Sequence, residues 1–201
     1  FFASLRRIIM NKTVIIIPSR LNAERLPNKP LKLINKREMI LHVCEAANKS
    51  NVGDVYVATP DQKIIDVVRS FGGNAILTSG KHQTGTDRTF EVFKEILKSN
   101  PSIIVNLQGD MPNIDPKDIN NLVNYMHQGK CEIGTLASEL SSNSELEDHN
   151  VVKVLVKEKM KPNTFYQALD FARIVKNTEY KTYHHIGIYA FTSKALIRYV
   201  G

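Results

Sequence analysis

Three basic side chains gather in a short stretch near the start of the chain. Arg20, Arg25 and Lys29 follow an apolar run, and Pro27 and Pro30 interrupt the same stretch. The prolines stiffen this loop, and a folded loop can bring the three cations around one polyphosphate. Arg offers a planar fork to phosphate oxygens, whereas Lys acts as a point charge. The alternative is a solvated basic loop without a ligand.

Two further segments carry groups that suit the same kind of ligand. Asp110 follows a glycine after an apolar run, and Mg²⁺ is commonly bound by one or two carboxylates together with substrate phosphates. The alternative for Asp110 is a turn or helix cap. Residues 83–86 offer small side chains and backbone N–H groups to a flat base or a ribose. Their alternative is an ordinary helix start capped by Thr86 or Asp87.

The apolar pattern predicts the elements that position these segments. From Thr13 onward, short apolar runs alternate with amphipathic helical patterns. The runs cover residues 14–17, 55–59, 75–77 and 103–107. This alternation predicts an α/β fold, in which an open, mostly parallel sheet has helices on both faces. Ligands bind at the carboxyl ends of such strands, so the three segments are expected to face one crevice, together with Thr59 and Asp61 at the end of the second run.

The pattern changes after residue 130. Strand-like stretches with longer polar connections cover residues 133–137, 151–156, 165–169 and 186–191. We interpret them as the completion of the sheet plus a small β excursion, within one domain. Lys153, Lys157, Lys159 and Lys161 are expected on the solvated side of a hairpin. His184 and His185 are adjacent on a strand and point to opposite faces, so at most one enters a given site.

Composition excludes several classes of protein. The 201 residues are 42% apolar and 23% charged, which is typical of a globular domain and not of disordered, collagen-like or coiled-coil chains. Two distant cysteines give no disulfide framework or metal-ligand spacing. No stretch has membrane-spanning length. The net charge of +7 favours an acidic partner. Neither a Walker A loop nor a GxGxxG motif follows the first apolar run, which disfavours P-loop and dinucleotide-binding enzymes.

Five motifs together resemble those of the CMP-KDO synthetases, also called 3-deoxy-manno-octulosonate cytidylyltransferases. They cover residues 18–20, 25–31, 82–88, 105–110 and 185–189. The resemblance runs from about Thr13 to Val200. It implies a Rossmann-like nucleotide-diphospho-sugar transferase fold, a homodimer, Mg²⁺ dependence and a cytoplasmic step of lipopolysaccharide biosynthesis. The implied reaction transfers CMP from CTP to 3-deoxy-manno-octulosonate (KDO) and releases pyrophosphate, without nucleic-acid or membrane partners.

The resemblance also implies a role for individual residues. Catalytic roles fall to Arg20, Lys29 and Asp110, with Asp110 as the Mg²⁺ ligand. The implied nucleotide-binding residues are Ser19, Arg20, Arg25, Lys29, Gln83, Thr84, Gly85 and Thr86. The implied sugar-binding residues are Gln108, Arg173, His185 and Tyr189.

The chain also departs from the family pattern. Met111 stands where the family usually has Glu, Ala23 replaces a small hydroxyl residue, and no proline follows Arg173. Family chains continue past the position of Val200 into segments that supply a second Mg²⁺-binding Asp. We therefore expect residues 1–12 to be an N-terminal extension and residues 13–201 to be one nucleotidyltransferase domain that lacks its C-terminal segment.

Three alternatives remain beside this interpretation. The first is a catalytically inactive, truncated relative of the same enzyme. The second is a CMP-sialate-type cytidylyltransferase, against which His185, Gly187 and Tyr189 argue. The third is a nucleic-acid binder, suggested by the basic composition but disfavoured because no aromatic residues are interleaved with a basic face.

Overall fold

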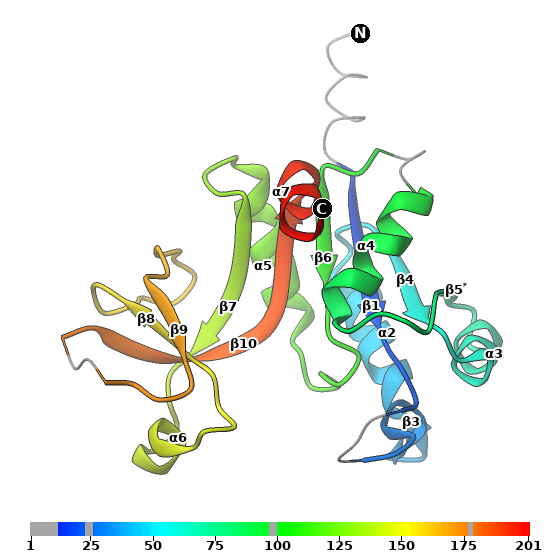
Figure 1. Ribbon diagram of the computed structural model, residues 1–201, viewed down its shortest axis with the longest axis horizontal. Coiled ribbons are helices and arrows are strands. Elements are labelled where there is room, and N and C mark those ends of the chain that lie inside the picture. The colour runs from blue at the N-terminus through cyan, green and yellow to red at the C-terminus, as the bar shows by residue number, and fades with distance from the viewer. Residues whose placement is uncertain (1–11, 23–25, 97–99, 177–178) are drawn as a thin grey trace, which may run out of the picture. The chain divides into compact units, whose positions relative to one another are not determined.

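The computed structural model describes residues 12–22, 26–96, 100–176 and 179–201 (Figure 1). The chain divides into two compact units, one comprising Phe1–Gly134 and Ile188–Gly201 and the other Thr135–Gly187. Among the described residues, no helix is long and apolar enough to cross a membrane.

The elements of the first unit alternate between strand and helix for most of its length. The strands are β1 (Thr13–Pro18), β2 (Leu33–Ile34), β3 (Arg37–Glu38), β4 (Asp54–Thr59), β5 (Asn74–Leu77) and β6 (Ile103–Asn106). The helices are the 3₁₀-helix η1 (Lys29–Leu31), α2 (Met39–Lys49), α3 (Gln62–Ser70), α4 (Gly85–Ile96), α5 (Pro116–His127) and α7 (Ser193–Val200). Strands β7 (Ile133–Ser138) and β10 (Lys181–Thr192) have residues in both units.

The sheet of the first unit has the predicted parallel core. β5, β4, β1 and β6 lie side by side in that order, and all neighbouring pairs are parallel. The last residues of β10 pair antiparallel with β6, so that Tyr189 lies opposite Asn106. β2 and β3 form a separate antiparallel pair. The prediction of an open, mostly parallel sheet is confirmed.

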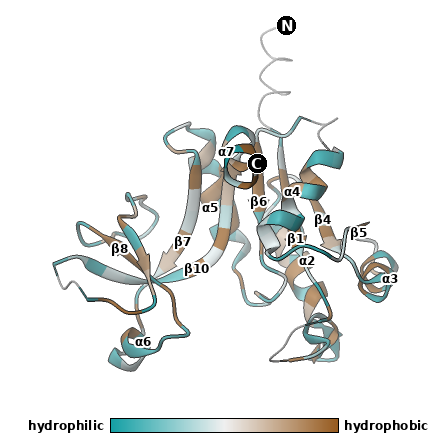
Figure 2. Ribbon diagram, viewed as in Figure 1, coloured by the Kyte–Doolittle hydropathy of each residue, from teal (hydrophilic) through white to brown (hydrophobic). Residues whose placement is uncertain are grey.

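Burial on both faces explains why β1 and β6 form the centre of this sheet. All six residues of β1 and all four of β6 are buried. Successive side chains of a strand point to opposite faces. Val14 and Ile16 pack with Phe93 of α4 and Leu196 of α7, whereas α2 and α5 contact β4 and β6 respectively and each other. Figure 2 shows the apolar residues concentrated on β4, β6 and α2.

The second unit is a small β structure with its own core. It contains α6 (Asn143–Glu147), β8 (Lys153–Val156), β9 (Asp170–Ala172) and parts of β7 and β10. β8 pairs antiparallel with β10 on one side and with β9 on the other. Val154, Val156 and Tyr183 form the buried cluster. Tyr183 also accepts a hydrogen bond at its hydroxyl from the backbone N of Met160, at 2.8 Å, which fixes the connection after β8.

Two predictions for this region are wrong. Residues 165–169 are not a strand, and β9 lies at 170–172 instead. The Tyr166 hydroxyl accepts a hydrogen bond from the backbone N of Lys161 at 3.1 Å, so residue 166 belongs to the local turn. Lys153 is not solvated but fully buried, and its Nζ donates to the carbonyls of Asp148 and Arg173. Lys157, Lys159 and Lys161 are exposed as predicted.

Candidate active site

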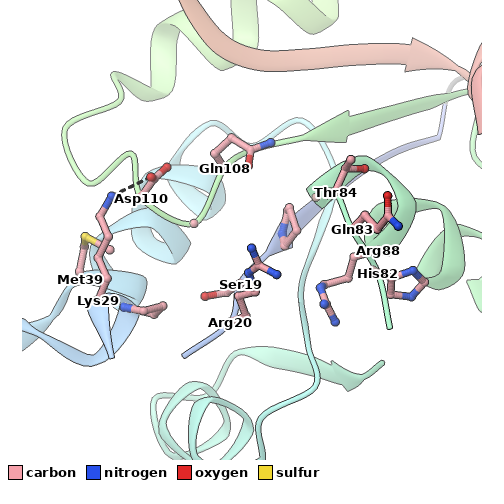
Figure 3. Close-up of a pocket in the computed structure, with 14 residues that line it drawn as sticks. Ser19, Arg20, Lys29, Met39, His82, Gln83, Thr84, Arg88, Gln108 and Asp110 are labelled. Atoms are coloured by element: carbon pink, nitrogen blue, oxygen red, sulfur yellow. Dashed lines mark hydrogen bonds and ion pairs between the residues drawn. The ribbon is translucent and has the colours of Figure 1, made fainter. Parts of the chain in front are cut away.

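A cavity of about 290 Å³ opens in the first unit where β1, β5 and β6 end (Figure 3). Its walls are the residues that follow these three strands, together with η1 and the first residue of α2. The lining residues are Pro18, Ser19, Arg20, Lys29, Pro30, Met39, His82, Gln83, Thr84, Gly85, Arg88, Gln108, Gly109 and Asp110. The prediction of one crevice is confirmed for the segments after these three strands, but it is wrong for Thr59 and Asp61, which lie at and after the end of β4 and are not among the lining residues.

One side of the cavity, which we call the cationic side, consists of Arg20, Lys29 and Asp110. Arg20 is exposed, and the Lys29 ammonium lies 2.7 Å from Asp110 Oδ2. The side chains of this ion pair are 36% and 52% exposed, so water screens the attraction between them. The ammonium can therefore exchange its present partner for a ligand oxygen, and the carboxylate can exchange it for a cation.

Local backbone structure presents the two cations of this side. The backbone N of Leu21, next to Arg20, donates a hydrogen bond to Asp61 Oδ2 at 2.8 Å. Lys29 begins η1, and the second residue of η1, Pro30, is buried. Asn28, just before it, has a φ of 58°, a left-handed conformation that Asn tolerates better than most residues. The chain thus turns sharply at Asn28 and brings Lys29 to the cavity.

The opposite side of the cavity includes His82, Gln83 and Thr84. They end the segment 78–84, which we call the clamped loop because three side chains of α4 hold it. Thr84 and Asp87 form a reciprocal cap: the Thr84 N–H donates to Asp87 Oδ2 at 3.0 Å, and the Asp87 N–H donates to Thr84 Oγ1 at 3.1 Å. The helix start predicted in this segment is therefore capped by Thr84, not by Thr86 or by Asp87 alone.

Arg88 and Glu91 fasten the rest of the clamped loop. Arg88 is 3% exposed, and its Nη1 donates to Thr78 Oγ1 and, at 3.0 Å, to the Ser79 carbonyl. Both carboxylate oxygens of Glu91 accept from the Ser79 N–H at 3.1 Å, and Oε2 also contacts His82 Nε2. The loop is therefore fixed by hydrogen bonds to charged groups, which are the stronger kind.

The directions of the pKa shifts of Arg88 and Glu91 agree with their burial and hydrogen bonds. Burial lowers the pKa of Arg88, and the nearby charge of Arg20 lowers it further, while Glu91 and Asp61 act in the opposite direction. For Glu91, burial acts to raise the pKa, but hydrogen bonds from His82 and the Ser79 backbone outweigh it and hold that pKa below its usual range. The cavity thus concentrates positive charge, and Glu91 stays ionised beside it.

A chain of amide and hydroxyl groups orients Gln108. Its Nε2 donates to Asn106 Oδ1 at 3.2 Å, and Asn106 Nδ2 donates to Thr86 Oγ1 at 3.1 Å. Asn106 is fully buried. Gln108 lines the cavity and Thr86 does not, so Thr86 supports the site through Asn106 in this arrangement.

The floor of the cavity is tightly packed around Ser19. A Cβ at Gly109 would lie 2.9 Å from the Pro18 carbonyl oxygen and 3.3 Å from Ser19 Oγ, so only glycine fits there. Ser19 is 7% exposed, and its hydroxyl has no hydrogen-bond partner among the described residues. An unpaired buried hydroxyl costs about 1–3 kcal/mol, and a ligand oxygen could satisfy it.

Three further predicted site residues, Arg173, His185 and Tyr189, are not among the lining residues. Arg25 falls outside the described residues. Tyr189 belongs to the first unit but packs beside its core instead of lining the cavity, and burial raises the pKa of its phenol. Arg173 and His185 belong to the second unit. Arg173 is exposed, and its Nη1 donates to the carbonyl of His149 at 2.9 Å.

His82 and Arg88 line the cavity, although the sequence analysis assigned neither of them a role. Both lie in the motif 82–88, so this motif could have identified them as candidate site residues. Their functions depend on partners that the motif does not contain. Thr78 and Ser79 precede it, and Glu91 follows it on the same face of α4, one turn after Arg88.

Comparison with known proteins agrees with this geometry. A family profile described as "Cytidylyltransferase" matches residues 14–201. The 3-deoxy-manno-octulosonate cytidylyltransferase of Brucella ovis is 39% identical over 191 residues, which cover 94% of this chain and 76% of the relative. The 8-amino-3,8-dideoxy-manno-octulosonate cytidylyltransferase of Shewanella amazonensis is also 39% identical, over 92% of this chain and 76% of the relative.

A solved structure shows the same similarity in three dimensions. CMP:2-keto-3-deoxy-manno-octonic acid synthetase, solved in complex with CTP, superposes with a TM-score of 0.82. Its sequence is 37% identical, and the match covers 94% of this chain and 77% of that one.

Proposed function

Because the chain belongs to the cytidylyltransferase family, we propose that it transfers CMP from CTP to KDO and releases pyrophosphate. The observation that carries this proposal is the cavity at the strand ends, where the cationic side and the clamped loop face each other. The first suits a triphosphate, and the second offers an ordered backbone to a base or ribose. The similarity to a CMP-KDO synthetase that binds CTP supports the same assignment.

The reaction needs charge stabilisation more than covalent chemistry from the protein. The anomeric hydroxyl of the sugar acid attacks the α-phosphorus in line, the bond to the β-phosphate oxygen breaks, and pyrophosphate leaves with growing negative charge. Arg20 and Lys29 are the residues we assign to the phosphate oxygens. Fixed cations at that position lower the barrier because they need not reorganise as the charge develops.

We assign the nucleoside to the opposite side of the cavity. Gln83, Thr84 and Gly85 line it there, and the Thr84–Asp87 cap fixes the direction in which this backbone runs. The buried Ser19 hydroxyl is a further donor for a nucleotide oxygen. Arg25 and Thr86 remain predicted nucleotide-binding residues.

Magnesium is the implied cofactor, and the cavity fits it through Asp110. The described residues contain no group of three potential metal-binding side chains. A single carboxylate is nevertheless compatible with Mg²⁺, which at nucleotide sites takes one or two carboxylates and substrate phosphate oxygens. When bound, Mg²⁺ would neutralise charge on the phosphates. Asp110 would hold it, and Lys29, its present partner, would then be released to the phosphates.

The sugar acid is assigned to Gln108, Arg173, His185 and Tyr189. Gln108 is the member of this set that lines the cavity, and the amide chain to Asn106 holds its orientation. From the family resemblance we further infer a homodimer that acts in the cytoplasm in lipopolysaccharide biosynthesis.

The direct test is pyrophosphate release by the purified 201-residue chain supplied with CTP, Mg²⁺ and KDO. We expect release only when the sugar acid is present. Parallel assays with the 8-amino analogue and with sialic acid identify the preferred acceptor. No release with any of them from a cooperatively folded sample would contradict the proposed activity and favour an inactive relative.

A further inference from the structure

Asp61 occupies a helix-capping position, but its carboxylate does not cap the helix. The residue lies just before α3 and has an extended backbone conformation. An aspartate at this position ordinarily accepts a hydrogen bond from a backbone N–H of the first helical turn. Within the described helix, the Asp61 side chain makes no such bond. The carboxylate is therefore available for a contact outside α3.

That contact is with the backbone that carries the two cations of the cavity. Asp61 Oδ2 accepts a hydrogen bond at 2.8 Å from the N–H of Leu21, 40 residues away in sequence. The Leu21 carbonyl in turn accepts from the Asn28 N–H at 3.0 Å. Leu21 directly follows Arg20, and Asn28 directly precedes Lys29. One carboxylate therefore fixes, through Leu21, the backbone next to both cations.

The backbone of Asp61 is itself attached to the core of the first unit. Its N–H donates to Thr59 Oγ1 at 3.1 Å, and its carbonyl accepts from the Ile64 N–H at 3.0 Å. Thr59 and Ile64 are both fully buried. A carboxylate acceptor also makes a stronger hydrogen bond than a neutral group does. Asp61 can therefore serve as a fixed and strong anchor for Leu21.

The charge of Asp61 lies close to the cavity, although the residue does not line it. Burial is the main cause that lowers the pKa of Arg88, and the charge of Asp61 acts in the opposite direction, so the two groups are close enough to interact. Arg88 lines the cavity, whereas Asp61 does not. A carboxylate near bound phosphates repels them. Its charge alone would therefore weaken the binding of a nucleotide, whereas its hydrogen bond to Leu21 would strengthen it.

We propose that Asp61 is a positioning residue for the two cations of the cavity, which it holds toward the phosphates of a nucleotide through the Leu21 backbone. That the ligand is a nucleotide rests on the function proposed above. The anchor itself rests only on the contacts among Asp61, Leu21 and Asn28. The proposal and simple repulsion predict opposite signs. If Asp61 positions the cations, its removal weakens phosphate binding, although a negative charge is lost.

The anchor is tested by amide hydrogen exchange of the ligand-free chain, resolved by NMR. Asp61→Ala removes the acceptor, Asp61→Asn keeps an acceptor oxygen without the charge, and Asp66→Ala is the control at an exposed position of α3. In Asp61→Ala we expect the Leu21 and Asn28 amides to exchange about tenfold faster, and the Ile64 amide to be unaffected. Asp61→Asn and Asp66→Ala should resemble the wild type. Unchanged exchange at Leu21 and Asn28 in Asp61→Ala overturns the anchor.

The effect on phosphate binding is tested by calorimetric titration of the same variants with CTP and Mg²⁺. Asp61→Ala should weaken binding roughly 3- to 10-fold, the effect of one hydrogen bond. Asp61→Asn should bind at least as tightly as the wild type, which shows that the loss in Asp61→Ala is not misfolding. Unchanged or tighter binding in Asp61→Ala overturns the positioning role. If the wild type does not bind CTP, the proposed function and the positioning role fail together, whereas amide exchange still decides the anchor.

Discussion

The two sides of the cavity are built differently. The clamped loop is held by three side chains of one helix, and Arg88, one of them, is almost fully buried. The cationic side has exposed head groups, and within it the described ion pair joins Lys29 to Asp110. The contrast indicates a division of labour. A flat base has a fixed shape and is bound best by a rigid loop. A triphosphate is flexible and is bound better by long cationic side chains that can adjust to its conformation.

The largest expected effect comes from removing a charge on the cationic side. Lys29→Ala should lower turnover by about 10²–10³-fold, which is typical for the loss of one preorganised charge-stabilising group. The free energy of unfolding should hardly change, because the lost ion pair is about half exposed. Lys32→Ala is the matched control, since Lys32 is exposed and does not line the cavity. Near-normal turnover in Lys29→Ala would remove Lys29 from the site.

A smaller effect is expected when the clamped loop is released. Glu91→Ala removes the carboxylate that contacts the Ser79 N–H and the His82 ring. The clamped loop should then lose its ordered conformation in the ligand-free protein. The KM for CTP should rise about tenfold, because hydrogen bonds to a charged group are worth about 1.5–3 kcal/mol. Turnover at saturating CTP should change much less than in Lys29→Ala. Glu95→Ala, at an exposed position one turn further along α4, serves as the control. Equal losses of turnover in both Lys29→Ala and Glu91→Ala would contradict the division between the two sides.

The smallest expected effect is a loss of folding stability at low pH. The pKa of Glu91 lies below its ordinary value of 4.5, so the folded state favours the ionised carboxylate. The stabilisation is complete above about pH 4.5 and is lost as the pH falls through the lower value in the folded state. Chemical unfolding of the wild type and Glu91→Gln should therefore differ by a constant amount between pH 5 and 8, and the difference should shrink below pH 4.5. A difference that already shrinks between pH 8 and pH 5.5 would show that the clamp depends on another titrating group.

Sequence reasoning succeeded where burial and strand ends alone decide the outcome. The fully apolar runs of β1 and β6 predicted central strands, and the polar residues after them do line one cavity. It failed where the outcome depends on tertiary partners. Lys153 was grouped with the exposed lysines that follow it, yet its ammonium is buried and bound by the carbonyls of Asp148 and Arg173.

The candidate site shows the same limit. Arg20, Lys29 and Asp110 could be predicted because exposed charges after a strand have few structural duties. Asn106 and Arg88 could not, because a buried polar side chain is identified by the groups that it holds. Asn106 was part of an apolar run, and its contacts with Thr86 and Gln108 depend on the arrangement of β6 against α4.

The buried position of Lys153 has a practical consequence for chemical labelling. Its Nζ donates to the carbonyl of Asp148 at 2.5 Å and to that of Arg173 at 2.8 Å, and no part of the residue reaches solvent. An acylating reagent needs an accessible, unprotonated amine, so Lys153 should resist modification while the exposed Lys157, Lys159 and Lys161 react at once. The lag before Lys153 becomes modified would then measure how often the second unit opens, with three internal standards in the same peptide region.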